Sequence, residues 1–220
     1  MLVWPNKKRN VSYPGRLDRP TVGRWQQMAA TRRRGAELDA AIFDAVLTEL
    51  HDVGFADLTV EGVARRAGTS KAVLYRRWST KLEMVITALA NTRLADITPP
   101  DTGSLAGDLR GTIHELLERL AAQGREVALG IMAGAASEPN PAAMTVLRTK
   151  AEDLSGVIIR RARDRGEIGA GPVPATAATL AFDLVRYRFL MEGSLSAEAI
   201  DDIVETAAVP LIRVHAAGAG

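Results

Sequence analysis

The sequence predicts an all-α protein with about nine helices. Apolar residues recur every three or four positions through most of the chain beyond residue 36, which is the spacing of one face of an α-helix. Glycine and proline interrupt this pattern at short intervals, and no stretch of useful length alternates apolar with polar residues as a half-buried strand does. We therefore expect an N-terminal three-helix helix-turn-helix unit, followed by a larger helical domain.

The composition excludes several kinds of chemistry. The 220 residues include no cysteine, so disulfides, thiolate metal sites and cysteine nucleophiles are absent, as in proteins that fold in a reducing cytoplasm. No run of about 18 apolar residues is available to span a membrane. The three histidines are scattered, and no common catalytic or phosphate-binding motif occurs. We expect no enzyme activity, no bound cofactor or metal, no membrane association and a cytoplasmic location.

Residues 1–35 differ in character from the rest of the chain. They carry nine basic side chains against the single acidic Asp18, whereas the remainder is acidic on balance. Proline and glycine are frequent there and no apolar period is sustained, which predicts a disordered basic arm. Such an arm can add salt-dependent affinity for phosphates. Met28, just ahead of the first helix, is an alternative start of the native chain.

The first helix is predicted from Ala36 to Gly54. Within it Ile42, Val46 and Leu50 recur every four residues and form one apolar stripe.

Two short helices are predicted next. Thr59 is the expected N-cap of the first, and Gly68 is suited to the left-handed conformation at its end. Thr69 or Ser70 caps the other, which runs to Trp78. The four residues 67–70 therefore form the turn of a helix-turn-helix, the geometry that places a helix in the DNA major groove.

The remaining helices follow similar punctuation. Ser79 or Thr80 is the expected cap of a helix that runs from Lys81 toward Ile97, and Pro210 is expected to kink or end the last helix. The five later helices are predicted at residues 104–122, 125–136, 141–165, 174–191 and 196–215.

Spacing assigns roles within the third helix. Leu74 and Trp78 are four residues apart and share the inner face, so Ala72 and Arg76 point outward. An outward arginine can pair with guanine O6 and N7, small apolar groups can touch thymine methyls, and hydroxyl and amino groups can bind phosphates. The expected DNA-binding residues are Thr59, Thr69, Ser70, Lys71, Ala72, Val73, Tyr75, Arg76, Arg77 and Lys81.

Each of these residues, taken alone, has an equally good structural explanation. Arg76 and Arg77 can be solvated surface charges, Tyr75 an aromatic at the edge of the core, and Thr59 merely a cap. Their order and spacing together favour DNA binding.

Residues 54–81 resemble the signature of the TetR family, especially members whose third helix ends in Tyr-Arg-Arg-Trp. The residues that carry the resemblance are Gly54, Phe55, Leu58, Thr59, Val60, Ala64, Ala67, Gly68, Ser70, Lys71, Leu74, Tyr75, Trp78 and Lys81. The resemblance implies that positions 59, 70, 71, 75 and 81 approach DNA. Gly62, Thr69 and Val73 depart from the family pattern, and the missing hydroxyl at position 73 leaves base reading more dependent on Arg76 and Lys71.

For the C-terminal domain the resemblance implies ligand sensing and dimerisation. We expect a homodimer through the helices near 174–191 and 196–215, whose apolar edges are equally compatible with an intramolecular core. These edges comprise Leu180, Leu184, Tyr187 and Met191, and Ile200, Ile203, Val204, Ala207, Leu211 and Val214. The candidate lining of a pocket for an unknown small-molecule effector, which core packing also explains, is His114, Met132, Met144, Phe182, Arg186, Tyr187 and Phe189.

The expected organisation is a basic arm (1–35), a helix-turn-helix DNA-binding domain (36–81) and a helical ligand-binding and dimerisation domain (82–220). We expect a transcriptional regulator, in the form of a homodimeric repressor that binds double-stranded operator DNA of near-palindromic sequence and is released by its effector. The alternative from another class is an all-α small-molecule carrier or accessory protein, in which the cations near residue 76 would be plain surface.

Overall fold

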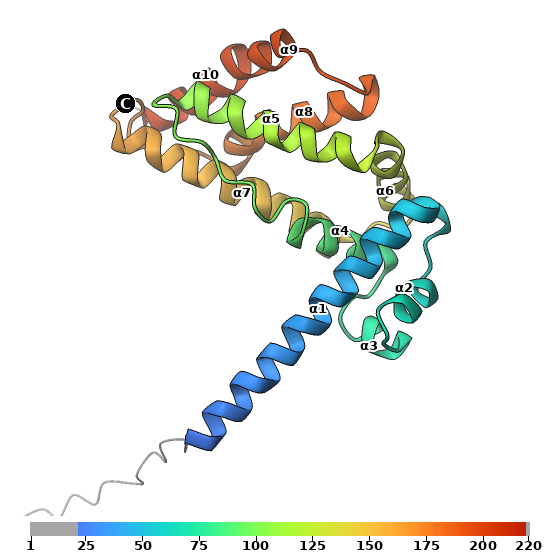
Figure 1. The fold of residues 1–220 in the computed structure, drawn as a ribbon. Coiled ribbons are helices and arrows are strands. Elements are labelled where there is room, and N and C mark those ends of the chain that lie inside the picture. Colours follow the sequence, from blue (N-terminus) through green and yellow to red (C-terminus); the bar gives the residue numbers. More distant parts are fainter. Residues whose placement is uncertain (1–21, 219–220) are drawn as a thin grey trace, which may run out of the picture. The chain divides into compact units, whose positions relative to one another are not determined.

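The computed structural model describes the backbone of residues 22–218 and the side chains of residues 35–218. Over this part of the chain the ordered elements are all helical, which confirms the predicted all-α fold (Figure 1). In chain order they are α1 (Val22–Asp57), α2 (Val60–Arg66), α3 (Lys71–Tyr75), α4 (Lys81–Asn91), α5 (Leu105–Gln123), α6 (Arg125–Ser137), α7 (Pro141–Asp164), α8 (Ala175–Glu192), α9 (Ala197–Asp202), the π-helical segment η1 (Ile203–Ala208) and α10 (Val209–Ala216).

Helix α1 begins at Val22, earlier than the start at Ala36 that the apolar pattern indicates. Residues 24–34 contain no proline and are rich in alanine, arginine and glutamine, which favour helix even where no apolar face is present. Disorder was therefore the wrong expectation for residues 22–35, and residues 1–21 lie outside the described part. By its contacts the chain divides into residues 1–37 and 38–220, and the packing of the helices concerns the second unit.

The apolar stripe of α1 and the inner face of α3 build one hydrophobic core. Ile42, Val46 and Leu50 are buried together with Leu74 and Trp78, which confirms the predicted inner face of the third helix. Since burial of a large apolar side chain stabilises a fold by about 1.5–3 kcal/mol, this core fixes the rotation of α3. The opposite side of α3 must therefore face away from the protein.

Helix caps follow the sequence signals closely. The Thr59 hydroxyl accepts a hydrogen bond from the Gly62 amide at 3.0 Å, as expected for the cap of α2. Of the two candidates for α4, Thr80 is the cap, because its hydroxyl accepts from the Glu83 amide. Ser70 occupies the cap position of α3, but its side chain makes no capping hydrogen bond.

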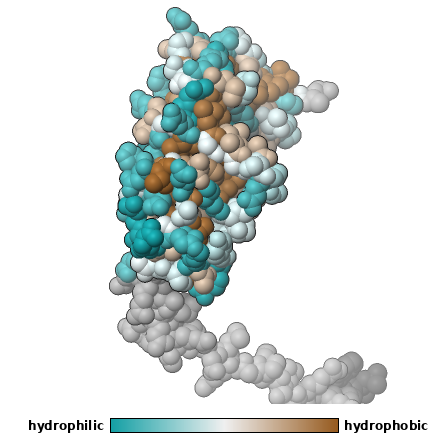
Figure 2. Space-filling view, turned by 90° about the vertical axis from the view of Figure 1, so that its right-hand side faces the viewer, coloured by the Kyte–Doolittle hydropathy of each residue, from teal (hydrophilic) through white to brown (hydrophobic). Residues whose placement is uncertain are grey.

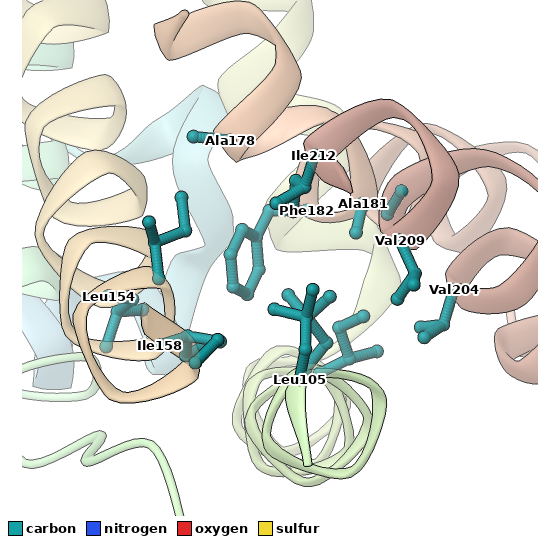
Figure 3. Close-up of a cluster of buried hydrophobic side chains, with 14 of the residues drawn as sticks. Leu105, Leu154, Ile158, Ala178, Ala181, Phe182, Val204, Val209 and Ile212 are labelled. Atoms are coloured by element: carbon teal, nitrogen blue, oxygen red, sulfur yellow. The ribbon is translucent and has the colours of Figure 1, made fainter. Parts of the chain in front are cut away.

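A second core joins α5, α7, α8 and the C-terminal helices. Phe182 projects from α8 into the space between these helices, toward Leu105 of α5 and Ile158 of α7 (Figure 3). All three side chains are fully buried. No helix of the described residues is long and apolar enough to cross a membrane. Apolar residues reach the surface only as patches among polar ones on the face that Figure 2 presents.

The last helix continues past Pro210, where a kink or an end was expected. The chain stays helical to Ala216, and the Val209 amide bonds to the Val204 carbonyl, five residues back, in η1. Proline lacks an amide hydrogen and its ring clashes with the carbonyl four residues earlier. The wider π turn relieves both constraints, so the helix passes the proline without breaking.

A buried carboxylate ties the segment before α5 to the end of α7. Asp108 has no exposed surface and accepts hydrogen bonds from the Thr102 amide at 2.7 Å and from Arg165 at 3.1 Å. Burial opposes the charge of Arg165, but its hydrogen bonds to Asp108 and Glu167 outweigh this effect and raise its pKa. The network thus pairs two charged side chains where the start of α5 meets the end of α7.

Candidate functional site

Helix α3 presents an exposed and chemically free surface. Ala72 and Arg76 are exposed, Val73 is half-buried, and Tyr75 exposes 56% of its surface. The Arg76 guanidinium forms no hydrogen bond or ion pair with residues 35–218, and the Ser70 hydroxyl makes no capping bond. Arginine offers five N–H donors in a planar fork, so Arg76 is free to make a bidentate contact with a base edge or a phosphate.

Two other predicted cations are engaged within the protein. Lys71 forms an ion pair with Glu61 of α2. Arg77 pairs with Asp39 of α1, and its guanidinium carbon lies 6.0 Å from the centroid of the Trp78 ring. Arg77 therefore has a structural role, because its ion pair links the end of α3 to α1. The ion pair of Lys71 instead lies on the exposed surface that α2 and α3 share.

Lys81 is held at the last residues of α1, which follow a break in the helical geometry at Gly54 (φ 75°, ψ 174°). Its Nζ donates hydrogen bonds to the carbonyls of Phe55 at 2.8 Å and Ala56 at 3.1 Å, and lies 4.7 Å from the centroid of the Phe55 ring. Hydrogen bonds from a charged donor to backbone carbonyls are stronger than those between neutral groups. The sequence suggested Lys81 as a phosphate contact, but the structure gives it a capping role that spacing along the chain does not reveal.

The remaining predicted DNA contacts are two threonines. Thr59 is exposed, and its hydroxyl oxygen caps α2. Thr69 is half-buried, and its amide donates to the Ala64 carbonyl at 2.9 Å. The end of α2 therefore occupies the Thr69 amide, which is not available to a phosphate.

Sequence reasoning missed Arg65. This residue is exposed on α2, and its guanidinium has no partner among residues 35–218. It lies four residues after Glu61, so both share the helix face that borders Lys71. The spacing of Glu61 and Arg65 was the available signal.

A cavity lies among α4, α5, α6, α7 and α8. Its volume is about 100 Å³, and Met132, Arg186 and Phe189 contribute to its lining as expected. Phe182 lines a neighbouring cavity of about 60 Å³, and Met144 lines an outer cleft. The other two candidates are misplaced for this role, because His114 and Tyr187 are exposed and line none of these three spaces.

The predicted dimer edges divide into core and surface. Ile200, Ile203 and Val204 are buried in the second core, so they are not available to a partner chain and that part of the prediction was wrong. On α8 and α10, Tyr187 and Val214 expose 62% and 70% of their surface. The other exposed or half-buried members are Leu180, Leu184, Met191, Ala207 and Leu211.

Two short helices around a tight turn, with an exposed and partly cationic second helix, define a helix-turn-helix DNA-binding regulator. Two family descriptions match the chain: "Bacterial regulatory proteins, tetR family" over residues 42–88 and "Tetracyclin repressor-like, C-terminal domain" over residues 99–207. The chain belongs to the TetR family of bacterial transcriptional regulators. This membership decides between the regulator and the carrier that the sequence left open.

Relatives of known name support the same family. The DNA-binding transcriptional repressor TetR of Mycobacteroides abscessus is 30% identical over 185 residues, which cover 82% of this chain and 96% of that protein. An uncharacterised HTH-type transcriptional regulator of Mycobacterium tuberculosis, Rv1556, is 32% identical over 139 residues, 61% of this chain and 67% of the relative. Among solved structures, the TetR family transcription regulator SCO0332 aligns with a TM-score of 0.61 at 25% identity, covering 77% of this chain and 95% of that one.

Proposed function

We propose that this regulator is a repressor that binds a near-palindromic operator as a homodimer and leaves the DNA when a small-molecule effector binds. The observation that carries the proposal is the outward face of α3, above all the guanidinium of Arg76, which has no partner among residues 35–218. A cation that none of these residues neutralises, on a helix whose opposite face is fixed in the core, is suited to an anionic partner.

The proposed reading of DNA follows from the chemistry of this face. Arg76 pairs with a guanine, Ala72 and Val73 contact thymine methyls, and Tyr75 and Ser70 bind phosphates. We further propose that the recognition helix is of the Tyr-Arg-Arg-Trp type. In this proposal Tyr75 and Arg76 bind the operator, whereas Arg77 and Trp78 stabilise the protein. The ion pair of Arg77 and the burial of Trp78 are consistent with this assignment.

Lys71 and Arg65 are proposed phosphate contacts on the surface between α2 and α3. Lys71 must exchange its pair with Glu61 for a phosphate, so its net contribution is smaller than that of an unpaired cation.

The proposed division of labour assigns residues 36–81 to DNA binding and residues 82–220 to effector binding and dimerisation. Helix α4 connects the two activities. At its N-terminus Lys81 holds the end of α1, and farther along Ile86 and Leu89 line the cavity. An effector in the cavity therefore contacts the helix that positions the DNA-reading unit. Release requires that the effector bind the DNA-incompetent arrangement more tightly than the DNA-bound one.

The proposed dimer forms through α8 and α10, in the regions predicted at 174–191 and 196–215, where large apolar side chains such as Tyr187, Met191 and Val214 are exposed. A two-fold dimer presents two recognition helices in equivalent orientations, so its operator has matching half-sites about one helical turn apart. Since the DNA of a bacterial cell lies in its cytoplasm, we also propose a cytoplasmic location.

The test is a comparison of two arginine variants on two kinds of DNA. The operator is first located by footprinting the region upstream of the regulator's own gene or by selection from random duplexes. Arg76→Ala should then weaken operator binding by about 1–3 kcal/mol and relax base preference at one position. Arg160→Ala, an exposed arginine of α7, is the matched control and should change nothing. An equal loss on operator and random duplex would contradict base reading by Arg76.

A further inference from the structure

The cavity among α4–α8 has a mostly apolar lining that includes arginines. Of its fifteen lining residues eleven are apolar and none is acidic, whereas three are arginines: Arg93, Arg119 and Arg186. In the neighbouring cavity the charged residues are Lys150 and, again, Arg186. Every charged side chain at these two apolar spaces is therefore a cation.

Local partners neutralise only part of this charge. Arg119 pairs with Glu115 at 2.6 Å, and Arg186 pairs with Asp183 at the same distance. Lys150 donates to a backbone carbonyl at 3.2 Å, which leaves its charge unbalanced. Arg93 is exposed at the rim and forms no ion pair or donated hydrogen bond with residues 35–218. The residues around the cavity consequently keep a net positive charge, although the cavity surface itself is apolar and the charged ends of the arginines do not open onto it.

Arg186 occupies the junction of three spaces. It lines both cavities and also the outer cleft, where the other charged residues are two acids and one base: Glu152, Asp183 and Arg148. The charges of that cleft balance when Arg186 is counted with them. Arg186 makes its only hydrogen bond among residues 35–218 from Nη2 to Asp183 Oδ1, so four of its five N–H donors are free for a further acceptor.

We propose that the effector is a small amphipathic monoanion. Its carboxylate binds the free N–H donors of Arg186 beside Asp183, on the side of the outer cleft, and its apolar body extends into the two apolar cavities. Their volumes, about 100 and 60 Å³, are of the order of the ~150 Å³ cavity that holds a benzene molecule. The body is thus a single ring or a chain of about six to eight carbons. This inference rests on the proposed function, since it takes the cavity to be the effector site.

Asp183 makes the inference testable in both directions. Because its carboxylate neutralises the charge of Arg186 and repels a second anion beside it, Asp183 opposes the binding of an anionic ligand. Removing the arginine should weaken the binding of an anion, and removing the aspartate should strengthen it. A side chain with a merely structural role would not give opposite effects for the two halves of one ion pair.

The experiment is isothermal titration calorimetry of the full-length protein with three probes of equal chain length: sodium octanoate, octan-1-ol and octylamine. Octanoate should bind at least about tenfold more tightly than octanol, a difference of about 1.4 kcal/mol, and octylamine should bind least. In Arg186→Met the two affinities should become equal. Asp183→Asn should raise the affinity for octanoate about threefold and leave that for octanol unchanged. Arg160→Met changes an exposed arginine that lines none of these three spaces, and it should behave as wild type.

Four results would overturn the inference: no binding of any probe, equal affinity for octanoate and octanol, tighter binding of octylamine, or an unchanged octanoate preference in Arg186→Met. If circular dichroism reveals that Arg186→Met is misfolded, the affinity of Asp183→Asn for octanoate tests the inference instead, and an affinity that does not rise would overturn it. Operator release is measured separately by fluorescence anisotropy of labelled DNA. Anion binding without release supports the ligand class and counts against the repressor mechanism, so the two proposals fail independently.

Discussion

Replacement of Lys81 by methionine should destabilise the protein and leave its DNA contacts intact. The substitution removes the Nζ that donates to the carbonyls of Phe55 and Ala56 but keeps an unbranched apolar side chain against the Phe55 ring. Its effect therefore isolates the charge that caps the end of α1.

The magnitude follows from three contacts. A hydrogen bond that involves a charged group contributes about 1.5–3 kcal/mol, and only the bond to the Phe55 carbonyl is partly buried, so the exposed bond to Ala56 adds less. The cation over the Phe55 ring adds about 0.5–1 kcal/mol at a partly exposed site. Contact of the methionine sulfur with the ring restores roughly 0.3–1.5 kcal/mol. We expect a net loss of about 2 kcal/mol.

Urea denaturation and differential scanning calorimetry measure the loss. For a protein of this size about 2 kcal/mol corresponds to a fall in Tm of roughly 4–8 °C. The salt dependence of operator binding is measured in parallel, with Lys71→Met as the matched variant. Among residues 35–218 Lys71 pairs only with the exposed Glu61, so its loss should lower the salt slope by about one and change stability little. If Lys81→Met instead lowers the salt slope and leaves Tm unchanged, Lys81 is a phosphate contact and the capping argument fails.

Three further substitutions test the packing and the proposed dimer. Gly134→Ala would bring a Cβ within 2.5 Å of Phe55 Cε1, so it should lower the unfolding free energy by about 1–3 kcal/mol in urea; an unchanged midpoint would mean that the ring yields freely. Asp108→Ala leaves Arg165 without its buried partner and should cost about 3 kcal/mol by the same assay, whereas a loss below about 1 kcal/mol would contradict the network. Tyr187→Glu should convert the proposed dimer to a monomer in light scattering, and a variant that stays dimeric would exclude this face.

The parts of the fold that the sequence predicts well are those that local signals determine. The Thr59 hydroxyl accepts its hydrogen bond from the Gly62 amide, which is only three residues away in the sequence. Likewise Gly68 adopts a φ of 62°, the left-handed conformation that ends α2, because glycine alone takes it without a steric cost. The inner face of α3 also follows from a four-residue period, because Leu74 and Trp78 pack together against the apolar stripe of α1. In each case the partner is near in sequence or repeats along a helix.

The parts that sequence reasoning missed depend on contacts between distant segments. Lys81 meets a carbonyl 26 residues away, and Arg77 meets Asp39 across the core. Nothing in the spacing of cations distinguishes a residue that caps a helix from one that binds a phosphate, because both need the same charge at the surface. Once the fold is known, the set of candidate DNA-binding residues is therefore smaller and centres on Arg76 and the α3 residues near it.

The last helix illustrates how one residue changes an interface. At ordinary helical spacing the apolar edge that starts at Ile200 and Val204 continues to Ala207 and Leu211. In the structure the buried positions after Val204 are instead Ala208, Val209, Ile212 and Ala216. The π turn of η1 accommodates one extra residue, and it therefore shifts the buried register by one position. Leu211 is thereby left half-buried and Val214 exposed, beside the free face of α8. The π turn that precedes Pro210 thus leaves part of the predicted dimer edge facing outward, where it is available to the second subunit that we propose.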